Sequence, residues 1–168
     1  MNEVLNTILN RRSVRAFQEE PVPSADLDAV VKAGLYAPSA MNQQSWHFSV
    51  ICGAAAKRYR AYCQEKLGRD PYYGAPAMIL VFSRKDAIAP LCDGSLAIGN
   101  MLLAAASLGL GTCWIHCVND LFREESAARE WGGPAGYRPV GSIALGFPAG
   151  SNPEPKPRAE GTVTQITE

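Results

Sequence analysis

Apolar residues recur along this chain at the spacing of amphipathic helices in five segments. The first predicted helix carries Val4, Leu5, Ile8 and Leu9 on one face. Ser24 is predicted to cap the second helix, which Pro38 ends. The five helices are expected over residues 2–10, 24–37, 54–67, 93–108 and 120–131. Leu27, Val30, Val31 and Leu35 form the expected buried stripe of the second helix.

Shorter segments rich in β-branched and aromatic residues predict four strands. They are expected over residues 46–51, 77–82, 112–116 and 140–147. Residues 77–82 are apolar almost throughout, which is typical of a strand buried on both faces. The alternating tail, residues 162–167, could add an edge strand to its own sheet or to a partner's.

The segment 93–108 has almost no polar side. A helix that is apolar nearly all round must be buried on more than one face. We therefore expect it to lie either at the centre of the domain or in a subunit interface.

Length and composition narrow the class of protein. A chain of 168 residues is expected to form one domain, residues 1–168. Lys and Arg together number 16 and equal Asp and Glu, so we expect neither nucleic acid nor an anionic membrane as a partner. Glu3 and Asn6 interrupt any apolar signal segment, and no apolar run is long enough to span a bilayer, which predicts a cytoplasmic location.

Five scattered cysteines do not form a disulfide framework, and Cys113 and Cys117 lack a second pair of ligands for zinc. We expect no metal site, and we expect the cysteines to be small buried side chains.

The clearest local excess of charge follows the first helix, where Arg11, Arg12, Ser13 and Arg15 lie close together in the chain. Guanidinium groups bind phosphate bidentately, and a serine hydroxyl adds a donor. The cluster therefore indicates a pocket for a phosphorylated small molecule. A solvated helix end, where cations are favoured by the helix dipole, explains it equally well.

The loop 37–46 is rich in amides and hydroxyls and lies between a predicted helix and a predicted strand. Amides supply both donors and acceptors, as recognition of a flat heteroaromatic ring requires. These side chains could instead satisfy nearby backbone groups, as they do in ordinary loops.

Common catalytic motifs are absent from the sequence. No nucleophile elbow, zinc-protease motif or P-loop occurs, and His47 has no acid partner nearby in the chain. Gly109 and Gly111 do not start a dinucleotide fingerprint, because Trp114 stands at the third glycine and a strand follows; they indicate a helix stop and a close backbone approach. If the protein is an enzyme, a cofactor must supply the reactive atom.

Four motifs in order resemble the FMN-dependent nitroreductase family. They are Arg11 to Arg15 followed by Pro21-Val22-Pro23, then Ala37-Pro38-Ser39-Ala40-x-Asn42-x-Gln44-x-Trp46, then residues 109–115, and Leu145-Gly146-Phe147-Pro148 before Lys156-Pro157-Arg158. The resemblance implies an α+β fold with a mixed central β-sheet flanked by helices. It also implies an obligate homodimer with FMN at the interface and the apolar helix 93–108 as the dimer helix.

Residue roles follow from the same resemblance. Arg11 and Ser13 would contact the FMN phosphate, Arg12 would lie beside it, and Arg15 would reach the ribityl chain and the N1/O2 edge of the ring. The late residues Lys156 and Arg158 would complete the phosphate site.

The ring would be approached by two further segments. Pro38, Ser39 and Asn42 would reach it from the other subunit, with Gln44 as a further candidate. The backbone from Trp114 through Ile115 to His116 would pass its N5 edge. No protein side chain is expected to be the reactive centre, because that role belongs to flavin N5.

The activity that the resemblance implies is a ping-pong cycle, in which NAD(P)H reduces the flavin and a nitroaromatic, quinone or similar acceptor reoxidises it. Two alternatives share every cofactor residue: a flavin-binding or flavin-remodelling protein without nitroreductase turnover, and an enzyme that uses ferredoxin or flavodoxin as donor. Ser45 stands where the family usually has proline, and Met41 where glycine is common. The short connection between Leu67 and Ala77 predicts an open pocket.

Overall fold

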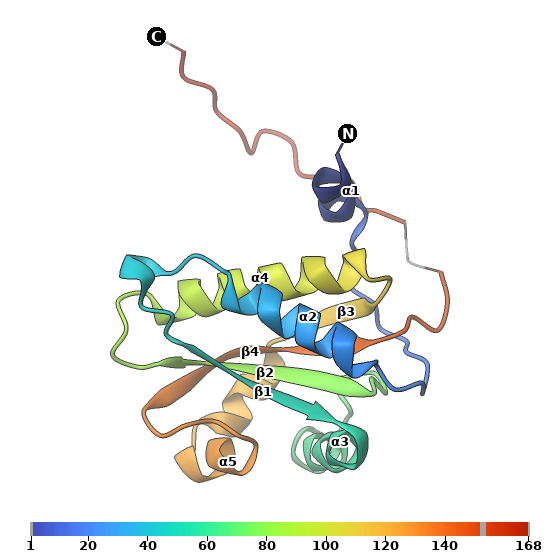
Figure 1. The fold of residues 1–168 in the computed structure, drawn as a ribbon, viewed down its shortest axis with the longest axis vertical. Coiled ribbons are helices and arrows are strands. Elements are labelled where there is room, and N and C mark those ends of the chain that lie inside the picture. The colour runs from blue at the N-terminus through green and yellow to red at the C-terminus, as the bar shows by residue number, and fades with distance from the viewer. Residues whose placement is uncertain (1, 152–153, 168) are drawn as a thin grey trace.

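The fold is built on one four-stranded antiparallel sheet. The computed structural model describes residues 2–151 and 154–167. The sheet order is β1-β2-β4-β3 (Figure 1). The strands are β1 Trp46–Cys52, β2 Ala77–Arg84, β3 Gly111–Ile115 and β4 Tyr137–Gly146. A separate parallel bridge joins Ser13 to Thr112 at the β3 edge.

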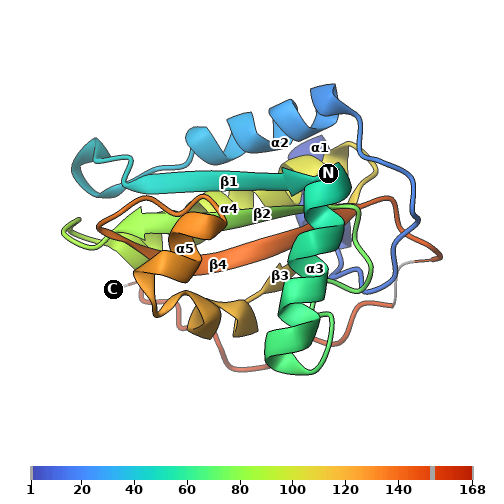
Figure 2. The ribbon, with the colours of Figure 1, turned by 90° about the horizontal axis from the view of Figure 1, so that it is seen from below.

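Helices cover both faces of the sheet, which confirms the predicted α+β class. The four strands pair antiparallel throughout, and parallel pairing, which the predicted mixed sheet would contain, is found only at the Ser13–Thr112 bridge among the described residues. Figure 1 shows α2 (Ser24–Leu35) and α4 (Pro90–Ser107) on one face. Figure 2 shows α3 (Gly53–Leu67) and α5 (Glu125–Glu130) across the other face. The short 3-10 helices η1 (Ala40–Asn42) and η2 (Cys117–Phe122) lie in connections. None of the helices in the described part of the chain could cross a membrane.

The hydrophobic core lies on both sides of β2 and β4. Every residue of β2 from Ala77 to Ser83 is buried, as its apolar sequence predicts. Alternating strand residues face α2 and α4 on one side and α3 and α5 on the other, because successive side chains of a strand point to opposite faces. The sheet is therefore sealed by apolar side chains on both faces.

Helix α1 (Glu3–Asn10) is amphipathic as predicted, but it has no buried residue. Its apolar residues Val4, Leu5, Ile8 and Leu9 are all exposed. Figure 1 shows why, since α1 lies outside the helix–sheet–helix layers, over the last turns of α4.

Several predicted boundaries are wrong. Residues 120–131 do not form one helix, because the chain first makes η2 and then the short α5. Ser24 is the first residue of α2 and makes no capping hydrogen bond. Leu35, the last residue of α2, is exposed, whereas its neighbour Gly34 is the residue that packs against Met101 of α4. The tail segment 162–167 forms no strand in its own sheet.

Candidate functional site

The arginine cluster is held against the first residues of β3. The Val14 amide donates to the Thr112 carbonyl at 2.8 Å, next to the Ser13–Thr112 bridge. A Cβ on Gly111 would lie 2.8 Å from Val14 Cγ2, so the chain can approach this closely only at a glycine. Gly109 has a φ of +76° and turns the chain out of α4. Both predicted roles of these glycines are confirmed.

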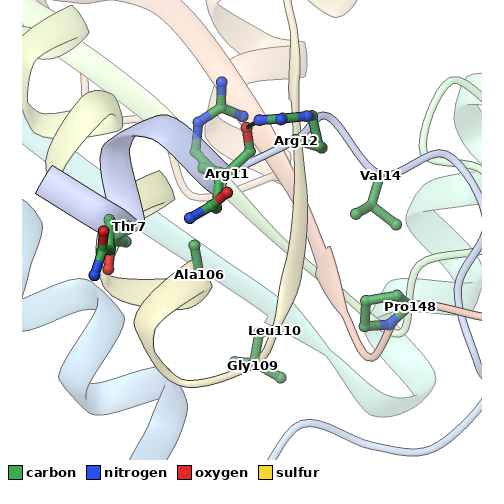
Figure 3. A pocket seen from close by; sticks show the side chains of 10 residues that line it. Thr7, Arg11, Arg12, Val14, Ala106, Gly109, Leu110 and Pro148 are labelled. Carbon is green, nitrogen blue, oxygen red and sulfur yellow. Dashed lines mark hydrogen bonds between the residues drawn. The ribbon is translucent and has the colours of Figure 1, made fainter. Parts of the chain in front are cut away.

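A cavity of about 310 Å³ opens beside this segment. Arg11 and Arg12 lie on one side of it, and Ala106, Gly109 and Leu110 lie on the other (Figure 3). The remaining lining residues are uncharged: Asn6, Thr7, Asn10, Val14 and Pro148. The cavity therefore combines two cations and several polar side chains with no acidic residue in its wall.

Backbone carbonyls fix the Arg12 side chain. Its Nη1 donates to the Leu9 carbonyl at 2.8 Å and to the Arg11 carbonyl at 2.9 Å. Its Nε is buried and has no partner among the described residues. A buried donor without an acceptor is costly, so one chain alone leaves the Arg12 guanidinium incompletely satisfied.

The electrostatic surroundings also favour an anion. In residues 2–151 and 154–167, no carboxylate forms an ion pair with Arg11, Arg12 or Arg15. Burial raises the pKa of the Cys113 thiol, and the nearby Arg15 and Arg11 oppose that rise. The positive charges of these two guanidiniums therefore act on the Cys113 thiol in β3. The residues present fit a phosphate group.

Only two residues of the arginine cluster, Arg11 and Arg12, line the cavity. Arg15 is exposed, and its Nη1 donates weakly to the Ser13 carbonyl at 3.4 Å. Ser13 is half-buried at the bridge to β3. Neither residue lines the cavity, so the structure brings Arg11 and Arg12 together there and leaves Arg15 at its outside.

The end of β3 presents a mixed surface. Ile115 is buried, whereas Trp114 and His116 are exposed. The Ile115 carbonyl accepts from Ser142 Oγ at 3.2 Å, which ties this backbone to β4. The ring of His116 contacts the Asn119 side chain, with 3.3 Å between His116 Nδ1 and Asn119 Nδ2. The other histidine, His47, is an exposed strand residue, as expected.

The amide-rich loop has an ordered, unusual backbone. Met41, Asn42 and Gln44 all have left-handed φ values, between 45° and 54°. Ser39 Oγ accepts from the Gln44 amide at 3.0 Å, and Gln44 Nε2 donates to Asn42 Oδ1 at 3.0 Å. Some of its polar side chains therefore satisfy the loop itself, which was the ordinary alternative. Pro38, Asn42 and Gln44 nevertheless remain exposed.

One chain does not bring the loop and the arginine cluster together. The loop contacts Asp93 in the first turn of α4, whereas Ala106 in its last turn lines the cavity. At a rise of 1.5 Å per residue, these two positions are about 20 Å apart. Figure 1 shows η1 and α1 at opposite ends of α4. Lys156 and Arg158 lie exposed in the extended tail and do not line the cavity.

Sequence reasoning missed Asp93 and its contacts with the loop. Asp93 is 2 % exposed, and its carboxylate accepts from the Ala40 amide and from Ser45 Oγ. An acidic residue inside an otherwise apolar helix was the available signal. It was interpreted only as the start of the helix, because helix N-termini commonly carry acidic residues.

Comparison with known proteins places these features in context. The family model described as "Nitroreductase family" matches residues 8–68 and 63–147. A crystal structure of a nitroreductase with bound FMN from Bacteroides fragilis superposes with a TM-score of 0.91, at 31 % identity, covering 99 % of this chain and 100 % of that one.

Two relatives in sequence carry named activities. A Methanothermobacter thermautotrophicus protein, named provisionally as an NADH dehydrogenase/NAD(P)H nitroreductase, is 35 % identical over 162 residues, covering 88 % of this chain and 78 % of the relative. A Bacillus subtilis FMN reductase [NAD(P)H] is 26 % identical, covering 94 % of this chain and 70 % of the relative.

Proposed function

Because this chain belongs to the nitroreductase family, we propose that it is an FMN-dependent oxidoreductase that takes electrons from NAD(P)H and passes them to an oxidised small molecule. The FMN-bound structural neighbour and the NAD(P)H-dependent relatives support the cofactor and the donor. The observation that carries the proposal is the cavity lined by Arg11 and Arg12, whose guanidiniums no described carboxylate neutralises.

The phosphate of FMN is the group that this cavity would hold. Arg11 and Arg12 supply charged donors at its wall, and Ser13 lies next to them on the same segment. Charge-assisted hydrogen bonds of this kind are roughly twice as strong as neutral ones. Arg158 and Lys156 are proposed to reach the same phosphate from the exposed tail.

The isoalloxazine ring is proposed to extend from the cavity past Arg15 and the end of β3. When bound, FMN supplies two-electron chemistry, accepting a hydride from NAD(P)H and reducing a nitroaromatic, quinone or similar acceptor in a second half-reaction. Arg15 is proposed to stabilise negative charge at the N1/O2 edge, and the field of a guanidinium is strongest where water is excluded. The backbone from Trp114 to His116 would lie beside N5.

A second copy of the chain is proposed to complete this site. The loop with Pro38, Ser39, Asn42 and Gln44 is too far from the cavity of its own chain, because α4 separates them. Two chains related by a two-fold axis, with their α4 helices antiparallel, would place the first turn of one α4 beside the last turn of the other. The loop of one protomer would then reach the cavity of its partner.

An apolar stripe on α4 supports this pairing. It consists of residues spaced at alternating three- and four-residue steps that are exposed or half-buried in the single chain: Cys92, Leu96, Gly99, Leu103 and Ala106. Spacing of this kind gives one continuous seam along a helix. Burial of the seam in a dimer accounts for the helix being apolar nearly all round, and it favours the interface over the domain centre as its location.

An absorption spectrum of the purified protein tests the proposal. We expect flavin bands that NAD(P)H bleaches in the absence of oxygen, and repeated oxidation of NAD(P)H when menadione or a nitrofuran is added. A protein that takes up no FMN would contradict the cofactor assignment. A protein that binds FMN without turnover would be a flavin-binding or flavin-remodelling module, and reduction only by ferredoxin or flavodoxin would identify a protein donor.

A further inference from the structure

Asp93 is an acidic residue that is buried at the first turn of α4, beside the amide-rich loop. It is 2 % exposed and lies in the first turn of α4, among otherwise apolar residues. No ion pair to it exists in the part of the chain that the structure describes. Burial of an unpaired carboxylate is unfavourable unless hydrogen bonds compensate for lost water. Its hydrogen bonds therefore indicate what it does.

Both carboxylate oxygens of Asp93 bind the amide-rich loop. Oδ1 accepts from the Ala40 amide at 3.0 Å, and Oδ2 accepts from Ser45 Oγ at 3.2 Å. The Ser45 hydroxyl also lies 3.4 Å from the Ser83 hydroxyl of β2. Ser45 and Ser83 are themselves 1 % and 0 % exposed. One side chain thus fixes the beginning and the end of the loop to the core.

The segment between these two attachment points needs such fixing. Met41, Asn42 and Gln44 have left-handed backbone angles, and none of them is a glycine. A left-handed backbone is unfavourable for residues other than glycine and persists only when the surroundings determine the conformation. Packing does not determine it here, because Met41 is 84 % exposed and Asn42 and Gln44 are also exposed. Hydrogen bonds from the Gln44 amide to Ser39 Oγ and from the Ile88 amide to Gln43 Oε1 add to the fixing of the loop, and Asp93 ties both of its ends to α4.

We propose that Asp93 is a positioning residue, which through Ala40 and Ser45 holds the loop 39–44 in the shape that presents Ser39 and Asn42 to the FMN of the partner protomer. This inference rests on the proposed function, since the flavin contacts of the loop belong to that proposal. The hydroxyl of Ser45 supplies the second of the two attachments. A proline at this position could not make the bond to Oδ2.

The test uses substitutions that separate loss of the hydrogen bonds to the loop from loss of the negative charge alone. Asp93→Ala removes both bonds to the loop, and Ser45→Ala removes one. Asp93→Asn keeps an acceptor for the Ala40 amide, and the Ser45 hydroxyl can turn to accept from its new NH₂ group. Asp86→Ala is the matched control, because the Asp86 side chain is 82 % exposed and contacts only Arg84 among described ion pairs.

The first measurement is amide hydrogen exchange of the full-length protein without FMN. In Asp93→Ala we expect exchange of the Ala40 amide and of residues 41–45 to quicken about tenfold or more, as loss of buried charge-assisted bonds implies. Exchange in β2 should stay slow, which separates loosening of the loop from global unfolding. Unchanged exchange at Ala40 would overturn the proposed attachment.

The second measurement follows FMN. Asp93→Ala is expected to weaken FMN binding about tenfold and Ser45→Ala less, with Asp93→Asn close to the unsubstituted protein. The midpoint potential of the bound flavin should fall in Asp93→Ala, because a loosened loop admits water and weakens the field of Arg15. A faster-exchanging loop with unchanged affinity and potential would overturn the positioning role. An unsubstituted protein that binds no FMN would overturn the proposed function, and the exchange data would then report on the attachment alone.

Discussion

A buried chain of hydroxyl groups on one face of the sheet differs from the arginine cluster at the edge of the other face in how far its polar groups are paired. On the face covered by α3 and α5, Tyr59 OH lies 3.1 Å from Tyr72 OH, which lies 2.8 Å from Ser142 Oγ. Ser142 Oγ then donates to the Ile115 carbonyl. This hydroxyl chain is buried and ends on a backbone acceptor. Each of its members finds a partner within one copy of the protein.

At the edge of the other face, beside α4, the polar groups are left incomplete. Arg12 Nε has no acceptor, the three clustered guanidiniums have no described carboxylate partner, and the seam of α4 is uncovered. The contrast separates stability from function. The hydroxyl chain, which one copy of the protein completes, holds the fold together, and the arginine edge with the seam of α4, which one copy leaves incomplete, is where we place the cofactor and the second protomer.

The largest expected effect is the loss of the dimer when a charge is introduced into the seam of α4. A Cβ on Gly99 would meet nothing within 4 Å, so Gly99→Glu fits the single chain. In the proposed dimer it would bury a carboxylate in the interface, a penalty of several kcal/mol. We expect a folded monomer that no longer retains FMN, measured by light scattering and flavin absorbance.

Ala61→Glu, on the exposed side of α3, is the matched control and should leave the dimer intact. A dimeric Gly99→Glu protein with full flavin content would place the interface elsewhere on the surface.

A smaller effect is expected from the phosphate cavity. Arg11→Ala should weaken FMN binding by about 1.5–3 kcal/mol, the range for a hydrogen bond to a charged group. Titration of the FMN-free protein with FMN measures it. Arg58→Ala, on the exposed surface of α3, is the control. Equal affinities of the two variants would remove Arg11 from the phosphate site.

In the buried hydroxyl chain, Tyr72→Phe should lower the free energy of unfolding and leave FMN affinity unchanged. The substitution removes the hydroxyl that joins Tyr59 to Ser142, and both are buried. We expect a loss of about 1–3 kcal/mol in the free energy of unfolding, measured in urea, with unchanged FMN affinity. A marked loss of FMN affinity would show that the two faces are not separate in function.

The smallest effect concerns pH. Burial raises the pKa of the Cys63 thiol from 9.0 to about 12, so the folded state keeps a proton that the unfolded state releases. Its contribution to stability is present below pH 9 and is lost as the pH rises toward 12. Each such group adds a slope of at most about 1.4 kcal/mol per pH unit.

Burial also raises the pKa values of Tyr59 and Tyr72. Cys63→Ala should therefore only reduce the alkaline slope of the unfolding free energy, measured from pH 8 to 10.5. An unchanged slope would show that the thiol does not titrate differently in the folded protein.

The sequence predicted the elements where one periodicity extends over many residues. β2 and α3 were placed within a residue or two, since neither has a competing pattern. The first part of the helix predicted over residues 120–131 is wrong, because Asp120 looks like a helix start, whereas α5 begins only at Glu125. The Asp120 carboxylate instead accepts from Arg123 at 2.7 Å, and the chain makes a 3-10 turn first.

The start of β4 was missed for a different reason. Pro139 argues against a central strand, yet it lies in β4 beyond the end of β3, where a bulge at Val81 and Phe82 adjusts the register of β2. At the site, the Arg11–Arg12 pair was predictable because guanidiniums cluster in sequence. The role of Asp93 was not, because its partners Ala40 and Ser45 lie far away in the chain and contact it only in the fold.

The length of α4 has a consequence for how this protein can evolve. In the proposed dimer the loop at one end of the helix must meet the partner's cavity at the other end, so the helix sets the spacing of two sites at once. Inserting four residues between Asp93 and Ala106 would lengthen it by about 6 Å, more than one turn. In both FMN sites of the proposed dimer, the loop of one protomer would then move away from the cavity of the other. Changes in acceptor preference are therefore expected to arise in surface connections such as that between Leu67 and Ala77, while the length of α4 stays constant.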